Sequence, residues 1–383
     1  GCSTAKIDSM SASENPFESK RNWTKLCEKL GVGSFGIATY FILFCAALIF
    51  GQIAYKGLPT FFKSEAPYVN TEFFTSNPEI LRVWHDAEGN KFSMPDKKFD
   101  VWRRDNPDAV ILDPHALNYS AGGIAGPLIG TALLVLFCMI IALSIGISAA
   151  IYLSEYCGKG RIMSMIRLSI LNLAGVPSIV FALFGWGIFC HAAPAIVDHV
   201  DERSLFAFSI GSNYLSFQGW GTSLLAGSCT LAIMVLPVII TACEESLCAV
   251  PKGFREASFA LGSSQWQTIR KAVLPYALPG ILTATVLGIT RVAGETAPIM
   301  LTATSTDKTD MPMQALQNEG VWAFFTQSVQ ALPFHIYTLA KLPDDPLSKP
   351  MQNGATFAFL LLVMGFAFVS ILLRNRVRKK LKW

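Results

Sequence analysis

Two charged side chains, Arg291 and Glu295, stand inside a long apolar stretch and are the first candidates for chemistry. Segment 278–301 contains no other Asp, Glu, Lys or Arg. An arginine near the centre of a membrane-spanning helix costs about 2.5–3.5 kcal/mol on insertion scales, so it should face protein or water. The spacing of four residues predicts that both side chains share one helical face and can form an ion pair. An anion could compete for the planar guanidinium fork, and a purely structural ion pair is the alternative.

No constellation typical of an enzyme accompanies this pair. The apolar stretches hold no paired carboxylates and no nucleophile next to a base, so no catalytic residue is predicted. The chain lacks the GxxxxGK[ST] loop that cradles a triphosphate, and the glycines of segment 31–36 lack its lysine. The five histidines and nine cysteines show no metal-ligand spacing, so we predict no metal site. We also predict that this chain binds no cofactor and has no nucleic-acid partner.

Composition places the elements that carry these residues in a membrane. Of 383 residues, 52% are hydrophobic and 15% are charged, whereas soluble domains carry about 25% charged residues. A helix needs about 20 mostly apolar residues to cross the hydrocarbon layer. The sequence therefore predicts an all-α membrane protein with six transmembrane helices. They are expected at Phe35–Tyr55, Gly126–Leu153, Leu168–Cys190, Thr222–Cys243, Leu278–Leu301 and Ala355–Leu373.

Basic residues indicate how these spans are oriented. With the N-terminus in the cytoplasm, the inner segments sum to a net charge of +10 and the outer segments to −6. This asymmetry follows the positive-inside rule and places both termini in the cytoplasm. The tail 374–383, with six basic residues, fits an inner leaflet rich in anionic lipid, so membrane lipid is a predicted partner.

Two segments interrupt the simple pattern of spans. Gly175 and Pro177 lie inside the third span, where a proline frees a carbonyl and kinks the axis. The break is either a packing kink, the simpler interpretation, or a hinge that lines a pathway. Segment 320–340 has no formal charge and is long enough to cross, but a seventh crossing would move the basic tail outside. We expect it to form a re-entrant or interfacial helix on the outer face.

The first outer loop, 56–125, is too long and too charged to be a mere connector. It is expected to fold as a small outer domain over the first helix. At the other side of that helix, 1–34 is expected to be a cytoplasmic tail, in which Gly1–Ser9 precede Met10 and resemble an upstream extension.

The third inner loop, 244–277, has the pattern of a helix, a turn and a second helix. Pro251 suits the entry to the first helix. Gly262 can take the left-handed conformation that ends it. Ser264 and Gln267 fit a capping box that opens the second helix, and Pro275 is expected to stop or kink that helix before the fifth span. An ordinary amphipathic loop is the alternative.

This loop resembles the EAA motif of ATP-binding-cassette importer permeases. The chain matches it at Glu256, Ala257, Gly262, Leu274 and Pro275, while Ser258 replaces the second alanine and Ala272 replaces an isoleucine. The resemblance implies that these residues form a coupling helix that docks on a separate ATPase subunit.

Further segments resemble the phosphate-specific transport permeases. They are Arg291–Ala303, Gly175–Gly185, Ile151–Tyr156 and Leu332–Tyr337, the last of which favours the A-type subunit over its C-type partner. The resemblance spans about 126–373, so the outer loop would make this a long-loop version. It implies a type I importer permease fold and a translocation pathway that includes Arg291, Glu295 and Thr296.

The resemblance also implies the partners: a second, C-type permease, two ATPase subunits that use ATP and Mg²⁺, and a periplasmic phosphate-binding protein. The predicted function is import of inorganic phosphate across the bacterial inner membrane. A permease for sulfate or molybdate, and a membrane scaffold that reports phosphate status to a signalling kinase, are the alternatives.

Overall fold

The computed structural model describes residues 22–62, 68–86, 88–107, 109–158, 160–192, 208–210, 213–215, 221–304, 321–342 and 348–380. Gly1–Ser9 and Lys382 therefore lie outside the described residues. The chain divides into two units, 1–55 and 56–383. Helix α1 (Asn22–Phe61) accounts for the described part of the first unit, and its apolar side chains from Phe35 to Phe50 are largely exposed, as expected of a helix whose partner is lipid or protein outside this unit.

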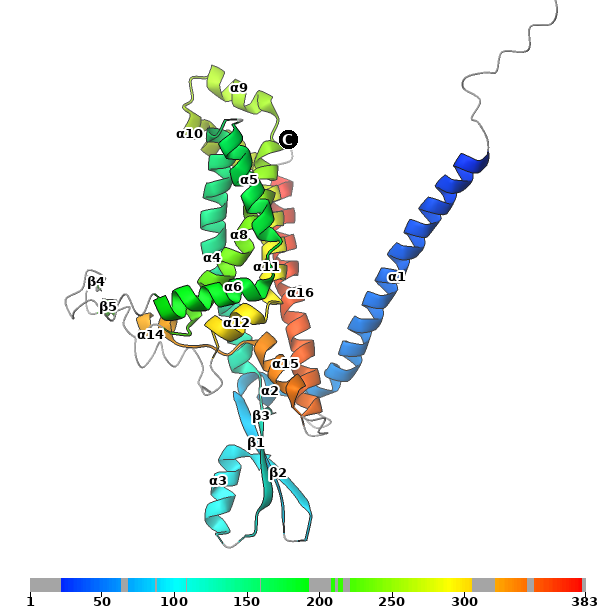
Figure 1. Ribbon diagram of the computed structural model, residues 1–383, viewed down its shortest axis with the longest axis vertical. Coiled ribbons are helices and arrows are strands. Elements are labelled where there is room, and N and C mark those ends of the chain that lie inside the picture. Colours follow the sequence, from blue (N-terminus) through cyan, green and yellow to red (C-terminus); the bar gives the residue numbers. More distant parts are fainter. Residues whose placement is uncertain are drawn as a thin grey trace, which may run out of the picture. The chain divides into compact units, whose positions relative to one another are not determined.

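The second unit is built around four long helices: α4 (Ala125–Ile151), α8 (Leu224–Cys248), α11 (Leu274–Ala293) and α16 (Lys349–Lys380). In Figure 1 they run side by side, with α8 packed against α4 and α11, and α11 packed against α16. Small residues allow this close approach: a side chain at Gly146 of α4 would clash with Ile239 of α8. Leu134, Val235 and Val292 are among the fully buried residues that fill the core between them.

The third predicted span is two helices joined at a sharp bend. Helix α5 (Arg161–Ala174) ends at Gly175, and α6 (Ser178–Gly185) begins after Pro177. A π-helical turn, η2 (Trp186–Ala192), continues α6. The two helical axes differ by 99°, which is far beyond an ordinary packing kink. The break predicted at Gly175 and Pro177 is thus present, but as a complete interruption of the helix.

The bounds predicted for the fifth span are wrong. The span begins at α10 (Gln265–Thr268), continues through the π-helical turn η3 (Ile269–Val273) and ends with α11 at Ala293. Pro275 does not stop this helix, because it lies in the first turn of α11, where the wider turn before it accommodates the missing donor. Helix α12 (Ala297–Thr302) is a separate short element after the break at Gly294–Thr296.

Segment 321–342 folds as two short helices, α14 (Val321–Thr326) and α15 (Leu332–Lys341). Ten residues of α-helix cover about 15 Å, which is half of the hydrocarbon thickness, so neither helix crosses. Five helices of the described chain are long and apolar enough to span a membrane, or six when α5 and α6 count as one span, as predicted.

The segment between α1 and α4 forms a small sheet with two helices. Strands β1 (Pro78–His85), β2 (Lys91–Pro95) and β3 (Leu112–Gly122) pair antiparallel in the order β2-β1-β3, and α2 (Thr71–Thr75) and α3 (Asp96–Asp105) flank them. Trp84 is fully buried against the rings of Phe99 and Trp102 of α3. Sequence reasoning predicted a folded outer domain but not its strands. A second pair, β4 (Phe208–Ile210) and β5 (Asn213–Leu215), lies after η2.

The sheet is joined to the helical bundle by buried contacts. Strand β3 runs into α4 through Ile124, which is fully buried. The ring of Tyr119 on β3 lies 5.2 Å from that of His335 on α15. His335 is 2% exposed, and burial lowers the pKa of its imidazole to about 3, so it is neutral at physiological pH. We call this end of the second unit the sheet end.

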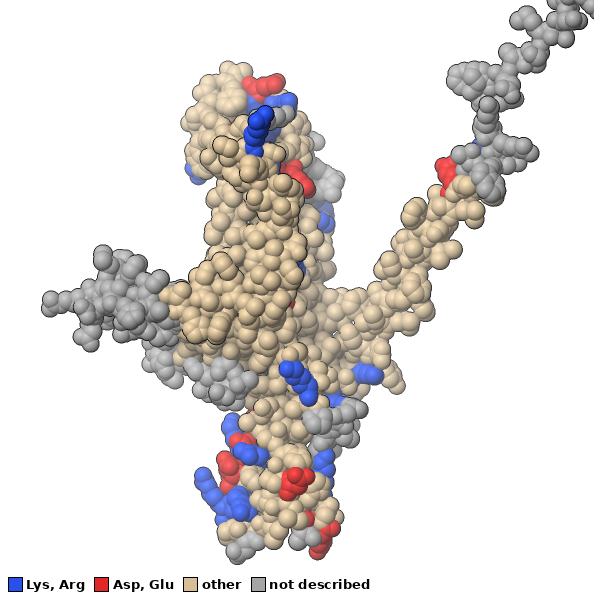
Figure 2. All heavy atoms as spheres, viewed as in Figure 1, with Lys and Arg blue, Asp and Glu red and all other residues tan. Residues whose placement is uncertain are grey.

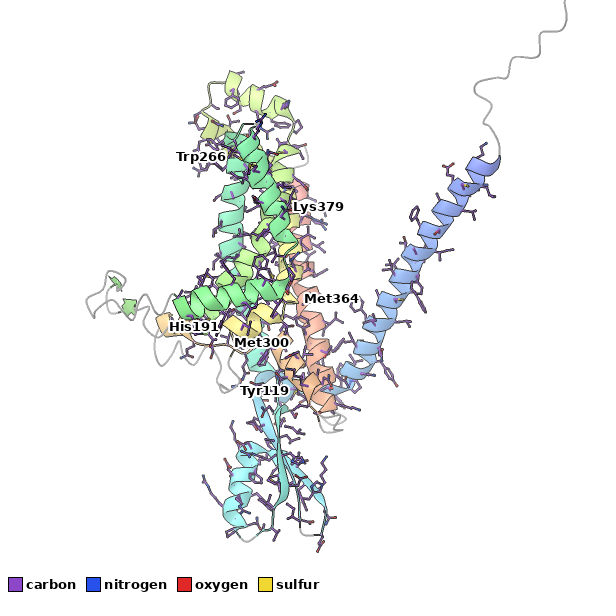
Figure 3. All side chains as sticks on the ribbon, viewed as in Figure 1. Tyr119, His191, Trp266, Met300, Met364 and Lys379 are labelled. Carbon is purple, nitrogen blue, oxygen red and sulfur yellow. The ribbon has the colours of Figure 1, made fainter. Side chains whose placement is uncertain are left out.

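The opposite end, the loop end, carries α9 (Lys252–Ala260) and the start of α10. Figure 3 shows Trp266 and Lys379 toward this end and Tyr119 at the sheet end. On the face drawn in Figure 2, charged side chains gather over the two ends, and the helical surface between them carries almost none. This distribution matches a unit that crosses the membrane between its two ends.

Cysteine labelling can test the orientation. With the native cysteines replaced, we expect a membrane-impermeant maleimide to label Lys98→Cys in intact cells, because the charge asymmetry of the sequence predicts that the sheet end faces outward. Gly253→Cys and Lys379→Cys should react only after the membrane is opened. Labelling of Lys379→Cys in intact cells would show that the chain crosses once more than the bundle indicates.

Candidate functional site

The loop at the loop end has the helix–turn–helix structure that the sequence predicts. Helix α9 ends at Ala260, and Gly262 follows with a φ of +78°, the left-handed conformation predicted for it. The amide of Gly262 donates to the carbonyl of Phe259, and that of Ser263 donates to the carbonyl of Ser258. These two bonds form a Schellman motif, which satisfies the last carbonyls of α9.

The predicted capping box is also present at the start of α10. The Ser264 hydroxyl accepts from the amide of Gln267, and the Gln267 side chain accepts from the amide of Ser264 at 3.0 Å. A hydrogen bond of 2.9 Å between the hydroxyls of Ser258 and Thr268 ties α9 to α10. The two helices therefore form one compact projection.

The residues of the EAA resemblance divide into two groups. Glu256, Ala257 and Gly262 are exposed on the projection, whereas Leu274 and Pro275 are half-buried where it joins α11. The projection also exposes large apolar side chains, with Leu261 87% and Trp266 56% exposed, and Phe254 and Phe259 beside them. Sequence reasoning did not single out these four, although apolar residues in a charged loop would have identified them. An exposed apolar patch of this kind is typical of a protein–protein contact.

Arg255 of α9 fixes the projection to the bundle. Its guanidinium donates to both carboxylate oxygens of Glu155, with the shortest contact 2.6 Å, and to the carbonyls of Leu247 and Val250. Glu155 belongs to η1 (Tyr152–Tyr156), the π-helical turn that ends α4. The hydrogen bonds to Glu155 raise the pKa of Arg255. This contact was not predicted, because the two residues lie 100 positions apart.

A second ion pair lies nearby. Arg167 of α5 donates to Glu244 of α8 at 2.7 Å and to the carbonyl of Leu153 at 2.9 Å. It joins α5, α8 and the end of α4 on the same side as the projection. The ends of α4, α5, α8 and α9 are thus connected by two arginines.

The structure contradicts the predicted ion pair between Arg291 and Glu295. Helix α11 ends at Ala293, so the two residues do not share a helical face, and no ion pair joins them in the described chain. Glu295 and Thr296 are half-buried in the break before α12. The Nε atom of Arg291 is buried and has no hydrogen-bond partner among the described residues. A buried guanidinium nitrogen without a partner is costly, so this atom is a candidate ligand-binding group.

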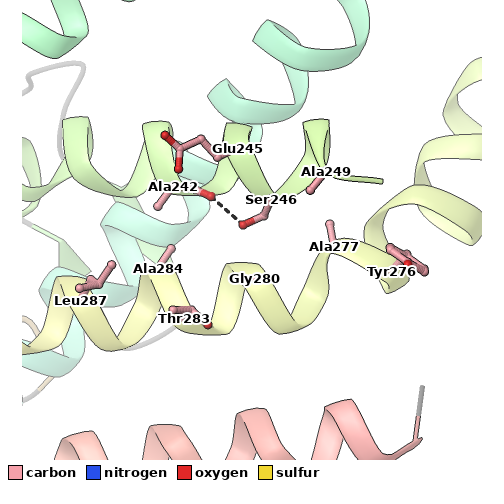
Figure 4. Close-up of a pocket in the computed structure, with 10 residues that line it drawn as sticks. All are labelled: Ala242, Glu245, Ser246, Ala249, Tyr276, Ala277, Gly280, Thr283, Ala284 and Leu287. Atoms are coloured by element: carbon pink, nitrogen blue, oxygen red, sulfur yellow. Dashed lines mark hydrogen bonds between the residues drawn. The ribbon is translucent and has the colours of Figure 1, made fainter. Parts of the chain in front are cut away.

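A groove of about 460 Å³ lies between α8 and α11, and the lining residue nearest to Arg291 in the sequence is Leu287. Figure 4 shows Ala242 and Ser246 of α8 opposite Ala277 and Ala284 of α11, with the Ser246 hydroxyl bonded to the Ala242 carbonyl. The lining positions on α11 include 277, 280, 284 and 287, and Arg291 continues this spacing of three and four residues. Arg291 therefore lies on the same face of α11, one helical turn beyond Leu287, and is not itself a lining residue.

A bundle of membrane-long helices, with a helical projection at one end and a groove between two of its long helices, is typical of a multi-span membrane permease. The chain belongs to the family described as the binding-protein-dependent transport system inner membrane component, which matches residues 142–383. It is accordingly a non-catalytic membrane subunit of a transport system.

Named relatives extend this assignment. The phosphate transport system permease protein PstA of Yersinia pestis is 32% identical over 263 residues, which are 69% of this chain and 75% of the relative. PstA 1 of Mycobacterium tuberculosis H37Rv is 34% identical over 224 residues, 58% of this chain and 61% of that protein. The probable permease YqgI of Bacillus subtilis is 26% identical over 68% of this chain and 81% of its own length. The resemblance to phosphate-specific permeases is thereby confirmed.

Among solved structures, the inward-facing methionine transporter MetNI covers 66% of this chain and 94% of its own, with a TM-score of 0.44 and 17% identity. Such a distant likeness adds nothing to the family assignment.

The left-handed turn at Gly262 can be tested by itself. Nothing lies within 4 Å of a Cβ built at Gly262 or at Gly253, but only Gly262 has a positive φ. Gly262→Val should therefore cost about 1–3 kcal/mol through backbone strain and open the projection. We expect trypsin to cleave the loop at least several-fold faster in inside-out vesicles. Gly253→Ala is the matched control and should leave the rate unchanged; equal rates for the parent and Gly262→Val would contradict the interpretation.

Proposed function

We propose that this chain is the A-type permease of an ATP-driven importer that moves inorganic phosphate into the bacterial cytoplasm. The observation that carries the proposal is the membership of its family together with relatives at 32–34% identity that are named phosphate transport permeases. Sulfate or molybdate import, and a role that mainly reports phosphate status, remain the alternatives.

In this proposal the loop end is cytoplasmic and docks the ATPase. The projection of α9 and α10 presents Glu256, Ala257 and Gly262 together with exposed apolar side chains, which suits a groove on a partner. ATP and Mg²⁺ are used by the ATPase subunits. A second, C-type permease completes the membrane portion, and a periplasmic phosphate-binding protein delivers substrate at the sheet end.

Arg291 is the proposed phosphate-binding group of the translocation pathway. It lies one helical turn beyond Leu287, which lines the groove between α8 and α11, and its Nε atom has no partner among the described residues. A guanidinium can donate two parallel hydrogen bonds to a phosphate, which would supply the missing partner. Glu295 and Thr296 follow in the break before α12, and their place in the pathway is part of the proposal. So is a hinge at Gly175 and Pro177, where the 99° bend separates α5 from α6.

Substitution of Arg291 tests the pathway. Arg291→Lys keeps the charge but loses the bidentate fork, so phosphate uptake at matched membrane expression should fall by about tenfold or more. Glu295→Gln should have a smaller effect, because no ion pair holds the two residues together. Arg161→Lys, at the exposed start of α5, is the control and should transport like the parent.

Two results would contradict this assignment. Parental uptake by Arg291→Lys would remove Arg291 from the pathway. Uptake of labelled phosphate that is abolished by excess sulfate or molybdate would identify another oxyanion as the substrate.

A further inference from the structure

Helix α9 is connected to the rest of the second unit without any buried side chain of its own. None of its nine residues is buried, so apolar packing does not fix it to the bundle. A docking helix that transmits movement must nevertheless be joined firmly to the helices that move. The polar contacts of α9 have to supply that connection.

Arg255 supplies the larger part of it. Its side chain is 19% exposed and that of Glu155 is 9% exposed, so the pair is shielded from water and from screening by salt. The planar guanidinium donates to the carboxylate through Nε and Nη2, and to two carbonyls through Nη1 and Nη2. A lysine at this position cannot donate this set of hydrogen bonds, because its ammonium group is a compact point charge without the planar arrangement of donors.

The acceptors of Arg255 belong to two helices of the bundle. Glu155 ends α4 through η1, and Leu247 lies in the last turn of α8, followed by Val250. A cation at the C-terminus of α8 also satisfies carbonyls that have no partner within the helix. Gln265 of α10 adds a bond of 2.7 Å to the Glu155 carbonyl. The projection is therefore fixed to the two helices that pack most closely in the core.

We propose that Arg255 is the positioning residue that couples movement of the docking projection to α4 and α8, with Glu155 as its anchor. This inference rests on the proposed function, because it assumes that an ATPase moves the projection. Without the link, the ATPase would still bind the exposed face of α9, and its movement would be absorbed by a loose helix. ATP hydrolysis would then continue with little transport.

The remaining links of α9 do not replace this one. The hydroxyl bond between Ser258 and Thr268 joins α9 only to its neighbour α10. The ring centroids of Phe254 and Tyr276 lie 4.9 Å apart and connect α9 to α11, with the two residues 41% and 43% exposed. Neither contact reaches α4 or α8.

The experiment compares phosphate uptake per ATP hydrolysed in proteoliposomes that contain the complete transporter. Arg255→Gln and Glu155→Gln each leave one charge without its partner, so assembly should fall in both. The double variant, Arg255→Gln with Glu155→Gln, removes both charges and should restore assembly. It should not restore coupling: we expect the uptake-to-hydrolysis ratio to stay at least tenfold below that of the parent.

A pair that only stabilises the fold would give a different result. The double variant would then recover both assembly and the parental ratio, and that outcome would overturn the proposal. If the double variant does not assemble, Arg255→Lys is used to test the proposal. This variant keeps the ion pair with Glu155 but loses the several donors of the planar guanidinium. A ratio several-fold below that of the parent supports the coupling role, and a parental ratio overturns it.

Arg82→Gln is the matched control. It breaks an ion pair of the same length, 2.6 Å, between β1 and Asp96 of α3 at the sheet end, and should leave the ratio unchanged. Failure of the proposed function gives a separate signature. If the parent transporter hydrolyses ATP but takes up another anion, the substrate assignment fails, and the same ratio is measured with that anion.

Discussion

The structure depends on one constraint: lipid offers no hydrogen bonds to the backbone, so every group that crosses the membrane must find its partner within the protein. The long helices satisfy it directly. Where prolines lie inside them, at Pro237 of α8 and Pro279 of α11, the missing amide leaves the carbonyl four residues earlier without its helical partner, which is tolerated where protein surrounds the helix. The same constraint explains why the full breaks, at Gly175–Pro177 and Gly294–Thr296, are short and are followed by helices, α6 and α12, that pack on one another.

The parts of the fold that could be predicted are those that local chemistry determines. Apolar length identified the spans, and the residue types at Gly262, Ser264 and Gln267 identified a turn and a cap that the structure contains. Predictions failed where the extent of a helix depended on its neighbours. Spacing alone suggested that Arg291 and Glu295 share a helical face, but α11 ends between them and packs against α8 and α16 instead. The strands beyond α1 were missed because charge, not alternation, dominated that segment.

The candidate site shows the same division. The exposed residues of the projection follow one another in sequence, so a motif can reveal them. The bonds of Arg255 and Gln265 to Glu155, which hold the projection against the end of α4, join residues 100 and 110 positions apart, and no spacing rule reaches that far. Arg255 and Arg167 perform similar tasks: each bridges a carboxylate on one helix and carbonyls at the end of another. Arginine suits this task because its donors point in several fixed directions at once.

The contact between Tyr119 and His335 has a consequence for how the molecule is made. The sheet is complete once residue 122 has been synthesised, and β1 and β3 can pair before the rest of the chain has been made. The contact between the sheet and the helical bundle can form only after His335, 216 residues after Tyr119, has been synthesised. Closing a contact over so long a stretch is slow, because the entropy of the intervening chain must be lost first. During biogenesis the sheet is therefore folded before its contact with α15 can form. Burial of the neutral His335 side chain is among the last steps of folding.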